Sequence, residues 1–320
     1  MGIKELSKFQ GWKDLALEVA WKGGAGHGVA PNPAWDIDKS EIGDVGILWP
    51  TKYEWPDARN WMEGLITGFK KFVAVDGAPI EQKFPGIVMF QILIGGKSHN
   101  ITIDYFDLST INEACAKDSA VYFKMQYSRA GYPLRNVVPG GYVPDSRKLY
   151  LYLSSLRRVR DRREFDFDVY GRFSLDYAKD RRKQAIELLR DQNRFAFEGG
   201  LTKVGYVEFL KQISRAKICI DLPGNGDFCH RLVNYLAVGA CVIGPRHGNE
   251  MQVPLVDRKH IAFTRDDMSD LIDLCVYYLE NDDAREAMCL ESRRYFDQNL
   301  HRDNLSRYYL RTILDHLAAS

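Results

Sequence analysis

The segment 214–244 constrains the fold more than any other part of this 320-residue chain. An apolar run at 216–222 ends in the turn Pro-Gly-Asn-Gly, and an amphipathic stretch follows at 228–238. Gly239 is placed to end that helix, and a second apolar run follows at 240–244. This order predicts a buried strand, a helix and a second buried strand, which is the repeating unit of an α/β sheet.

The turn between the first strand and the helix has the chemistry of an anion site. Gly224 and Gly226 let the backbone approach a ligand, and the start of a helix offers unpaired N–H groups with a partial positive charge. Arg231 follows in the first turn of the helix, where a guanidinium can grip phosphate with two hydrogen bonds. The glycines alone fit an ordinary strand–turn–helix of any Rossmann-like domain equally well.

The rest of the chain repeats the alternation of strands and helices on both sides of the Pro- and Gly-rich segment Val137–Pro144. We expect two α/β domains, residues 1–144 and 145–296, each with a largely parallel sheet, followed by a helical segment at 297–320. In the first domain we expect helices at 12–21, 55–72 and 108–117, and strands at 44–50, 86–94, 99–105 and 119–125.

Composition excludes several classes of protein. With 45% hydrophobic and 27% charged residues the chain matches a folded globular protein, and a net charge of +1 excludes a general attraction to nucleic acid. The six cysteines lack zinc-site spacing and several lie in apolar runs, so we expect buried reduced thiols and no metal site. No apolar run approaches the ~20 residues of a membrane span. We expect a cytoplasmic protein, with contact to a membrane surface left open.

The segment 214–244 resembles the donor-site signature of GT-B glycosyltransferases. The pair His230-Arg231, followed by Tyr-Leu-Ala-Val-Gly-Ala-Cys-Val-Ile at 235–243, is most similar to the exostosin-like and CAP10-like (protein O-glucosyltransferase) branches and to group 1 donor domains. The resemblance implies two Rossmann-like domains facing across a cleft, with a C-terminal helix that crosses back to the first domain. It also implies a nucleotide-sugar co-substrate, with a UDP-sugar expected, no other cofactor and no catalytic metal.

By the same resemblance, Arg231 holds the donor diphosphate, Lys203 reaches a phosphate, and Arg172 points into the cleft. Retaining members of the glycogen-synthase-like branch carry two glutamates eight residues apart, where this sequence has Gly226 and Asn234. The full set of expected donor-binding residues is Arg172, Gly199, Gly200, Leu201, Lys203, Tyr206, Gly224, Asn225, Gly226, Asp227, Phe228, His230, Arg231, Asn234 and His247.

The resemblance also implies that the acceptor lies against the first domain and that an inverting member draws its catalytic base from it. In that domain two carboxylates end an apolar strand. Asp104 and Asp107 are the candidates, because a general base must take the proton of the attacking hydroxyl near the end of a strand. Asp107 can instead cap the helix expected at 108–117. Trp49, Tyr53 and Trp55, after the first strand, are candidates for stacking on a sugar or base, and ordinary core or rim aromatics explain them equally well.

Several alternatives stay open at this point. A nucleotide-sugar epimerase and a catalytically inactive nucleotide-sugar-binding protein fit the same scaffold. A transferase that glycosylates modified DNA bases would use the arginine-rich run 157–163 as a groove, although a solvated helix face explains that run as well. The acceptor hydroxyl could belong to a saccharide, a small molecule, a protein or a modified nucleic acid, and the sequence leaves the oligomeric state undetermined.

Overall fold

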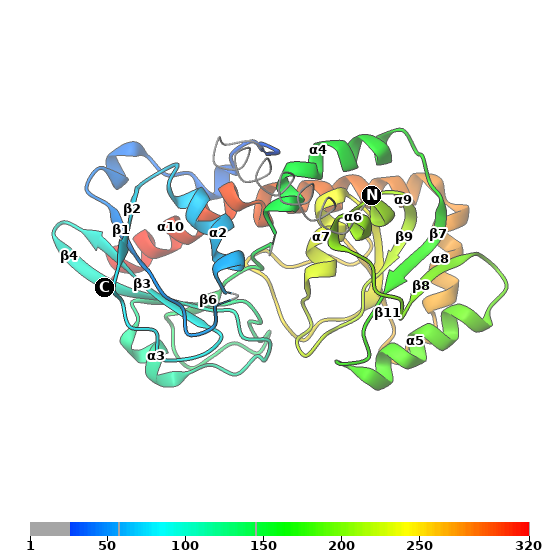
Figure 1. The fold of residues 1–320 in the computed structure, drawn as a ribbon, viewed down its shortest axis with the longest axis horizontal. Helices are drawn as coiled ribbons and strands as arrows, with labels where there is room; N and C mark the ends of the chain where they lie inside the picture. Colours follow the sequence, from blue (N-terminus) through cyan, green and yellow to red (C-terminus); the bar gives the residue numbers. More distant parts are fainter. Residues whose placement is uncertain (1–25, 57, 145, 320) are drawn as a thin grey trace, which may run out of the picture.

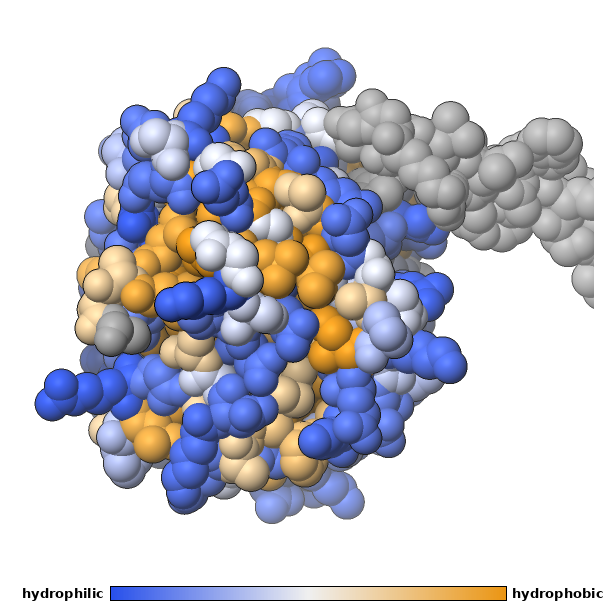
Figure 2. Space-filling view, turned by 90° about the vertical axis from the view of Figure 1, so that its left-hand side faces the viewer, coloured by the Kyte–Doolittle hydropathy of each residue, from blue (hydrophilic) through white to orange (hydrophobic). Residues whose placement is uncertain are grey.

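The computed structural model describes residues 26–56, 58–144 and 146–319. They form two α/β units side by side, each built on its own sheet (Figure 1). The helix expected at 12–21 lies outside the described residues. Figure 2 views the outer end of the N-terminal unit, where hydrophobic and hydrophilic residues are interspersed. No helix in the described part of the chain is long and apolar enough to cross a membrane.

The N-terminal sheet has six strands in the order β2-β1-β3-β4-β5-β6. Their bounds are β1 Gly46–Pro50, β2 Ala74–Ala78, β3 Ile87–Ile94, β4 Lys97–Asp104, β5 Val121–Lys124 and β6 Val137–Pro139. Helix α2 (Ala58–Phe69) packs on one face of this sheet in a core that contains Phe69, Phe90 and Phe123. The short helix α3 (Glu113–Asp118) contacts β4 and β5.

Strands β2 and β6 are not among the strands that the sequence predicts, and two further details of this unit differ from the expectation. β3 runs antiparallel to both of its neighbours, because Gly95 and Gly96 adopt left-handed φ values of 55° and 76° and turn the chain directly back into β4. Helix α3 begins at Glu113 rather than at 108, because the Asn112 side chain caps it by accepting a hydrogen bond from the Cys115 N–H at 3.0 Å.

The C-terminal sheet is fully parallel, in the order β11-β10-β9-β7-β8. Its strands are β7 Phe167–Arg172, β8 Phe197–Gly200, β9 Ala216–Ile220, β10 Cys241–Pro245 and β11 Ala262–Thr264. The chain starts at β7, extends to β8, and then returns across β7 to build β9 on the other side. This reversal is the topological switch point of a doubly wound sheet, and ligands bind outside the carboxyl ends of the two strands that flank it, here β7 and β9.

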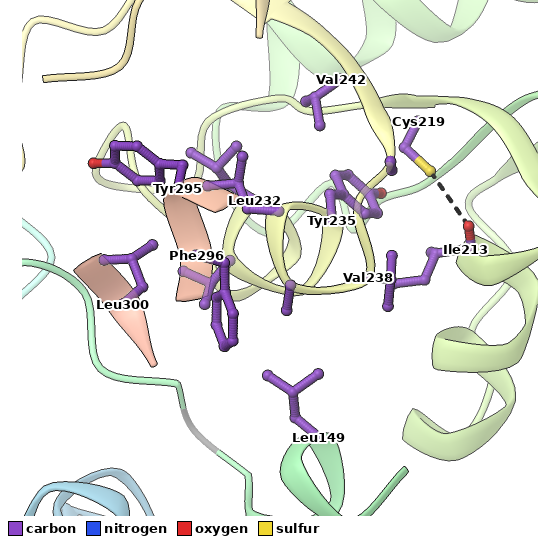
Figure 3. Packing of buried hydrophobic residues seen from close by; sticks show 14 of the residues in the cluster. Leu149, Ile213, Cys219, Leu232, Tyr235, Val238, Val242, Tyr295, Phe296 and Leu300 are labelled. Atoms are coloured by element: carbon purple, nitrogen blue, oxygen red, sulfur yellow. Dashed lines mark hydrogen bonds between the residues drawn. The ribbon is translucent and has the colours of Figure 1, made fainter. Parts of the chain in front are cut away.

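Helices cover both faces of the C-terminal sheet: α4 Arg147–Asp161, α5 Lys179–Asp191, α6 Tyr206–Ser214, α7 His230–Val238 and α8 Leu271–Glu280. α7 is the most deeply buried of them, because every residue from Leu232 to Val238 is buried. Figure 3 shows Leu232, Tyr235 and Val238 of this helix inside the cluster that fixes its position. Gly239 ends α7 in the left-handed conformation, with φ at 79°.

The C-terminal helical segment joins the two units, as the resemblance implied. α9 (Asp282–Tyr295) packs on α7 and β10, a π-turn follows at Phe296–Leu300, and α10 (Arg302–Ala318) then packs on α2 of the N-terminal unit (Figure 1). The contact between α10 and α2 is close, because a Cβ on Gly68 would lie 2.1 Å from Ser306 Oγ. The observed fold is therefore the expected pair of Rossmann-like domains with a helix that crosses back.

Candidate functional site

Residues 221–229, called the glycine loop below, connect β9 to α7 at the switch point. The Gly224 N–H donates to Gly226 O at 2.9 Å and closes a tight turn. No side chain caps the N-terminus of α7, whose first two residues are His230 and Arg231. The loop thus presents a bare helix terminus, which favours a bound anion.

Two guanidinium groups flank the glycine loop. Arg231 donates from Nη2 to Leu222 O at 2.6 Å and lies over the Phe173 ring, while its buried Nε has no hydrogen-bond partner. Arg182, from α5, is 2% exposed and donates from Nε to Pro223 O and from Nη1 to Ser174 O. Burial and the nearby Arg231 charge lower the pKa of Arg182. Burial of two like charges is unfavourable, and the charge of the buried Asp221 opposes this effect on the pKa of both arginines.

The N-terminal unit holds the glycine loop in place. Gln126, which is 1% exposed and follows β5, donates from Nε2 to Phe228 O at 2.8 Å, and its Oε1 accepts from the Phe228 N–H at 3.2 Å. The approach at Gly226 is closer still, because a Cβ there would lie 2.3 Å from Asp107 O. A glycine is required at this position because of the neighbouring unit and not because of its own φ value.

A cavity of about 710 Å³ lies between the two units and is called the interdomain cavity below. Its N-terminal wall consists of Trp55, Trp61, residues 105–108 and Tyr142. Its C-terminal wall consists of Ser174, Tyr177, Arg182, residues 224–226 and residues 228–231.

A second cavity of about 390 Å³ lies between β7, α6 and α7, and is called the Tyr206 pocket below. Its walls include Phe173, Phe209, residues 202–204, Tyr206 and Asn234. Tyr206 donates from its hydroxyl to Asn234 Oδ1 at 2.9 Å. The two cavities share His230 and Arg231, so Arg231 lies where a ligand in one would meet a ligand in the other.

Most of the residues predicted for the site line one of these two cavities. They are Asp107, Arg172, Lys203, Tyr206, Gly224, Asn225, Gly226, Phe228, His230, Arg231 and Asn234. Arg172 is held inside the Tyr206 pocket by an ion pair of 2.7 Å with Glu198 and by a hydrogen bond to Thr202 O.

The other predicted residues line neither cavity: Asp104, Gly199, Gly200, Leu201, Asp227 and His247. Gly199 serves the sheet, because its φ is 135° and a Cβ would lie 2.0 Å from Gly171 O. Asp227 Oδ2 accepts hydrogen bonds from the N–H groups of Gly248 and Asn249. Asp227 therefore fastens the glycine loop to the loop after β10.

The two candidate carboxylates of the N-terminal unit lie in different surroundings. Asp104 is 2% exposed; its Oδ1 binds Lys124 Nζ at 2.8 Å and its Oδ2 accepts from the Tyr122 hydroxyl at 2.5 Å. Burial raises the pKa of Asp104, and the ion pair with Lys124 opposes that shift. Asp107 is partly exposed and lines the interdomain cavity. The structure thus brings Asp107, and not Asp104, to the space where an acceptor can lie.

Two buried titratable groups are Asp221, at the start of the glycine loop, and His247, in the loop after β10. Burial raises the pKa of Asp221 to about 6, against the opposing effect of the Arg231 charge. Burial also lowers the pKa of His247 to about 4, and its ring lies between Phe228 and Phe263. His247 is therefore neutral at pH 7 and supports the loop from below.

Sequence reasoning missed Arg182, Phe173, Tyr177 and Phe209 as site residues. The only signal for Arg182 is the run Arg181-Arg-Lys183, in which the two flanking side chains are exposed and the middle one is buried. In the other arginine-rich run, 157–163, two side chains point inward, whereas Arg158, Arg162 and Arg163 are exposed. Within it, Arg157 pairs with Asp297 at 2.7 Å and Arg160 donates to Ala216 O at 2.7 Å.

The fold and these two cavities define a two-domain α/β protein with a glycine loop and two flanking arginines at the switch point of its C-terminal sheet. The model of a family described as glycosyl transferase-like matches residues 148–315, more than half of the chain. The chain belongs to this glycosyl transferase-like family. The match covers the family as a whole and does not single out the exostosin-like or CAP10-like branch.

Two solved structures are similar to parts of the chain. A glycosyltransferase from Rickettsia africae ESF-5 matches over 53% of this chain and 45% of its own, with 15% identity and a TM-score of 0.33. A mutant of S. aureus TarM, in complex with fondaparinux, alpha-GlcNAc-glycerol and UDP, matches over 62% of this chain and 44% of its own, with 10% identity and a TM-score of 0.40. The chain spans less than half the length of either structure. No curated protein matches the chain.

Proposed function

We propose that this protein is a glycosyltransferase that moves a sugar from a nucleoside diphosphate sugar to a hydroxyl acceptor in the interdomain cavity. The observation that carries the proposal is the pairing of Arg182 and Arg231 at the bare N-terminus of α7, on the floor of that cavity. A diphosphate placed there would neutralise the part of the two guanidinium charges that the buried Asp221 leaves uncompensated.

The same arrangement supports a division of labour for the reaction. In the proposed step, the acceptor oxygen bonds to the anomeric carbon, the bond from that carbon to the diphosphate breaks, and its electrons leave with the diphosphate. Arg231, Arg182 and the helix terminus stabilise the charge that develops on the leaving group, so that no metal ion is required. Asp107, across the cavity, accepts the proton of the attacking hydroxyl.

The nucleoside then belongs in the Tyr206 pocket. Phe173 and Phe209 offer aromatic faces, and Lys203 adds a positive charge at its rim. Tyr206 and Asn234 fix a polar edge within hydrogen-bond reach of a ribose. We take a UDP-sugar as the first candidate donor, used as a co-substrate with no further cofactor.

A thermal-shift panel of nucleotide sugars and nucleoside diphosphates tests the proposal, because a ligand that binds only the folded state raises the melting temperature. We expect one base to stand out and Arg231→Ala to weaken donor binding about 10- to 100-fold, from the loss of charged hydrogen bonds worth about 1.5–3 kcal/mol. Arg158→Ala, an exposed arginine on α4, is the control. Unchanged donor binding and donor hydrolysis in Arg231→Ala would refute the proposal.

The same material separates the alternative functions. An epimerase converts the donor in the absence of any acceptor. Without an acceptor, a transferase only hydrolyses the donor slowly, so that the sugar passes to water and the nucleoside diphosphate is released. An inactive binding protein shows tight donor binding with no turnover. A DNA-modifying enzyme binds duplex DNA at low salt, and the burial of Arg157 and Arg160 leaves fewer arginines of the run 157–163 for such a groove.

A further inference from the structure

Exposed apolar side chains gather in the interdomain cavity. Eight large hydrophobic residues are exposed in the described part of the chain, and four of them line this one cavity. They are Trp55, Phe106, Leu108 and Tyr177, each 44–47% exposed. Large apolar side chains scattered singly over a surface are ordinary, but a concentration inside a concave site marks a binding surface.

The rings on the N-terminal wall form a firm platform. Trp55 stacks on Tyr105 with ring centroids 6.1 Å apart and 24° between the planes. Tyr105 in turn contacts Trp61 at 5.6 Å, and Trp61 meets the edge of His230 at 4.6 Å. Trp55 therefore keeps its position through a chain of rings, and Tyr177 lies on the opposite wall of the same cavity.

Charge is divided unequally between the two walls. Asp107 is the one formally charged residue of the described N-terminal wall, whereas Arg182 and Arg231 both belong to the C-terminal wall, at the glycine loop. The cation near Asp107 is Lys124, which is fully buried and already paired with Asp104 at 2.8 Å. A phosphate or carboxylate on the acceptor would therefore approach Asp107 with no exposed cation on the same wall, at a cost that rises with desolvation. The N-terminal wall thus selects against an anionic acceptor.

We infer that the acceptor of the transfer proposed above is an uncharged saccharide whose ring stacks on Trp55 and places its hydroxyl at Asp107. This inference rests on the proposed function and specifies its acceptor. A sugar ring has an apolar C–H face and a polar edge, which matches a cavity wall that carries the rings of Trp55 and Phe106 together with the carboxylate of Asp107. A purely apolar alcohol has one hydroxyl, which the attack at Asp107 uses, and offers no further polar group to Asn225 in the same cavity.

The test measures nucleoside diphosphate release and product mass, with the full chain and the donor that the thermal-shift panel identifies. The acceptors are glucose, cellobiose, maltose, lactose and diacetylchitobiose, with glucose 6-phosphate as the charged match of glucose, decanol as the apolar alcohol and duplex DNA with hydroxymethylcytosine. We expect transfer to at least one neutral saccharide, and at least tenfold slower transfer to the phosphate than to glucose.

Substitutions at Trp55 test whether the saccharide binds to the ring platform of the N-terminal wall. We expect Trp55→Ala to raise the KM for the saccharide about 3- to 10-fold, the range of an aromatic stacking contact, with the donor KM unchanged. Trp55→Phe should restore most of the loss, which also shows that the site still folds. Tyr277→Ala removes an exposed ring on α8, outside the cavity, and is the matched control.

The outcomes separate the inference from the function on which it rests. Faster transfer to glucose 6-phosphate, decanol or DNA than to every neutral saccharide overturns the inference. So does donor hydrolysis that no saccharide accelerates, or a saccharide KM that Trp55→Ala does not change. The absence of any nucleotide-sugar binding or hydrolysis by the wild-type protein would instead reject the proposed glycosyltransferase itself.

Discussion

Replacing Gly226 by alanine tests the fit between the glycine loop and the N-terminal unit. The added methyl would lie 2.3 Å from Asp107 O, 2.4 Å from Gln126 Cδ and 2.5 Å from Gln126 Nε2. Carbon atoms pack at about 3.5–4.0 Å, so the loop or its neighbours must move by more than about 1 Å. Neither neighbour is free to yield, because one is backbone and the other is a buried amide that holds Phe228.

Overpacking of this kind costs about 1–3 kcal/mol. With an unfolding entropy of roughly 2 cal/mol/K per residue, we expect the melting temperature to fall by about 2–4 °C. If the loop shifts instead, the same energy appears as donor affinity that is about 5- to 150-fold weaker. Calorimetry of unfolding and titration with the nucleoside diphosphate measure the two quantities on one sample.

Two controls isolate the steric effect of Gly226→Ala. Gly224→Ala alters the same loop, but its Cβ would meet no atom closer than 3.8 Å, so we expect unchanged stability. A Cβ on Gly28 would meet nothing within 4 Å. The reasoning is refuted if Gly226→Ala matches Gly28→Ala in both melting temperature and donor affinity.

Three further predictions concern single groups. Arg182→Met should weaken diphosphate binding about tenfold or more by titration calorimetry, while Arg181→Met on the exposed side of α5 should not, and equal affinities would remove Arg182 from the site. Gln126→Leu leaves both backbone groups of Phe228 without their partner. We therefore expect the free energy of unfolding, measured with denaturant, to fall by about 2 kcal/mol or more. Burial lowers the pKa of His247, His260 and His301 to about 4. Each of these imidazoles binds its proton mainly after unfolding, so the free energy of unfolding should fall from pH 7 to pH 5 by up to about 2 kcal/mol for each of them. Asp221, with its raised pKa of about 6, opposes that trend by about 1 kcal/mol, and a denaturant midpoint that does not fall on acidification would contradict the prediction.

The strand, turn and helix of the glycine loop could be predicted from the sequence because these parts are contiguous, whereas anion binding by the loop stays a prediction. A buried strand, a glycine turn, a helix start and a left-handed cap at Gly239 each leave a local pattern, and all of them occur within 214–244. The alternation of strands and helices predicted the two Rossmann-like domains for the same reason. The antiparallel β3 departs from a largely parallel sheet through a two-residue turn that is itself local, at Gly95 and Gly96.

Arg182 could not be predicted because its role depends on distant partners. A basic run in an amphipathic helix reads as a solvated face, and only the contacts to Pro223 O and Ser174 O show that the middle side chain points inward. The same applies to Gln126, whose three partner atoms lie more than 100 residues away in sequence. The hydrophobic pattern of one element does not show which side chains will meet partners on another element.

Asp104 shows a second reason why the sequence alone does not predict the site correctly. A carboxylate at the end of an apolar strand fits a catalytic base and a buried ion pair equally well. Asp104 and Lys124 are register partners on adjacent parallel strands, so the pair is decided by strand pairing, which single-strand patterns do not contain. A lysine inside the apolar run 121–125 is a hint, because a buried ammonium group needs a carboxylate partner.

The two halves of the proposed site are linked through the loop that they share. Gln126 of the N-terminal unit holds both backbone groups of Phe228, and Asp107 contributes its carbonyl to the wall against Gly226. The arrangement of the glycine loop that binds an anion is thus the arrangement that packs against the N-terminal unit. By linkage, a donor that binds this form of the loop also stabilises the contact between the domains. The acceptor wall and its carboxylate Asp107 are therefore brought to the donor by the same contact that orders the anion site.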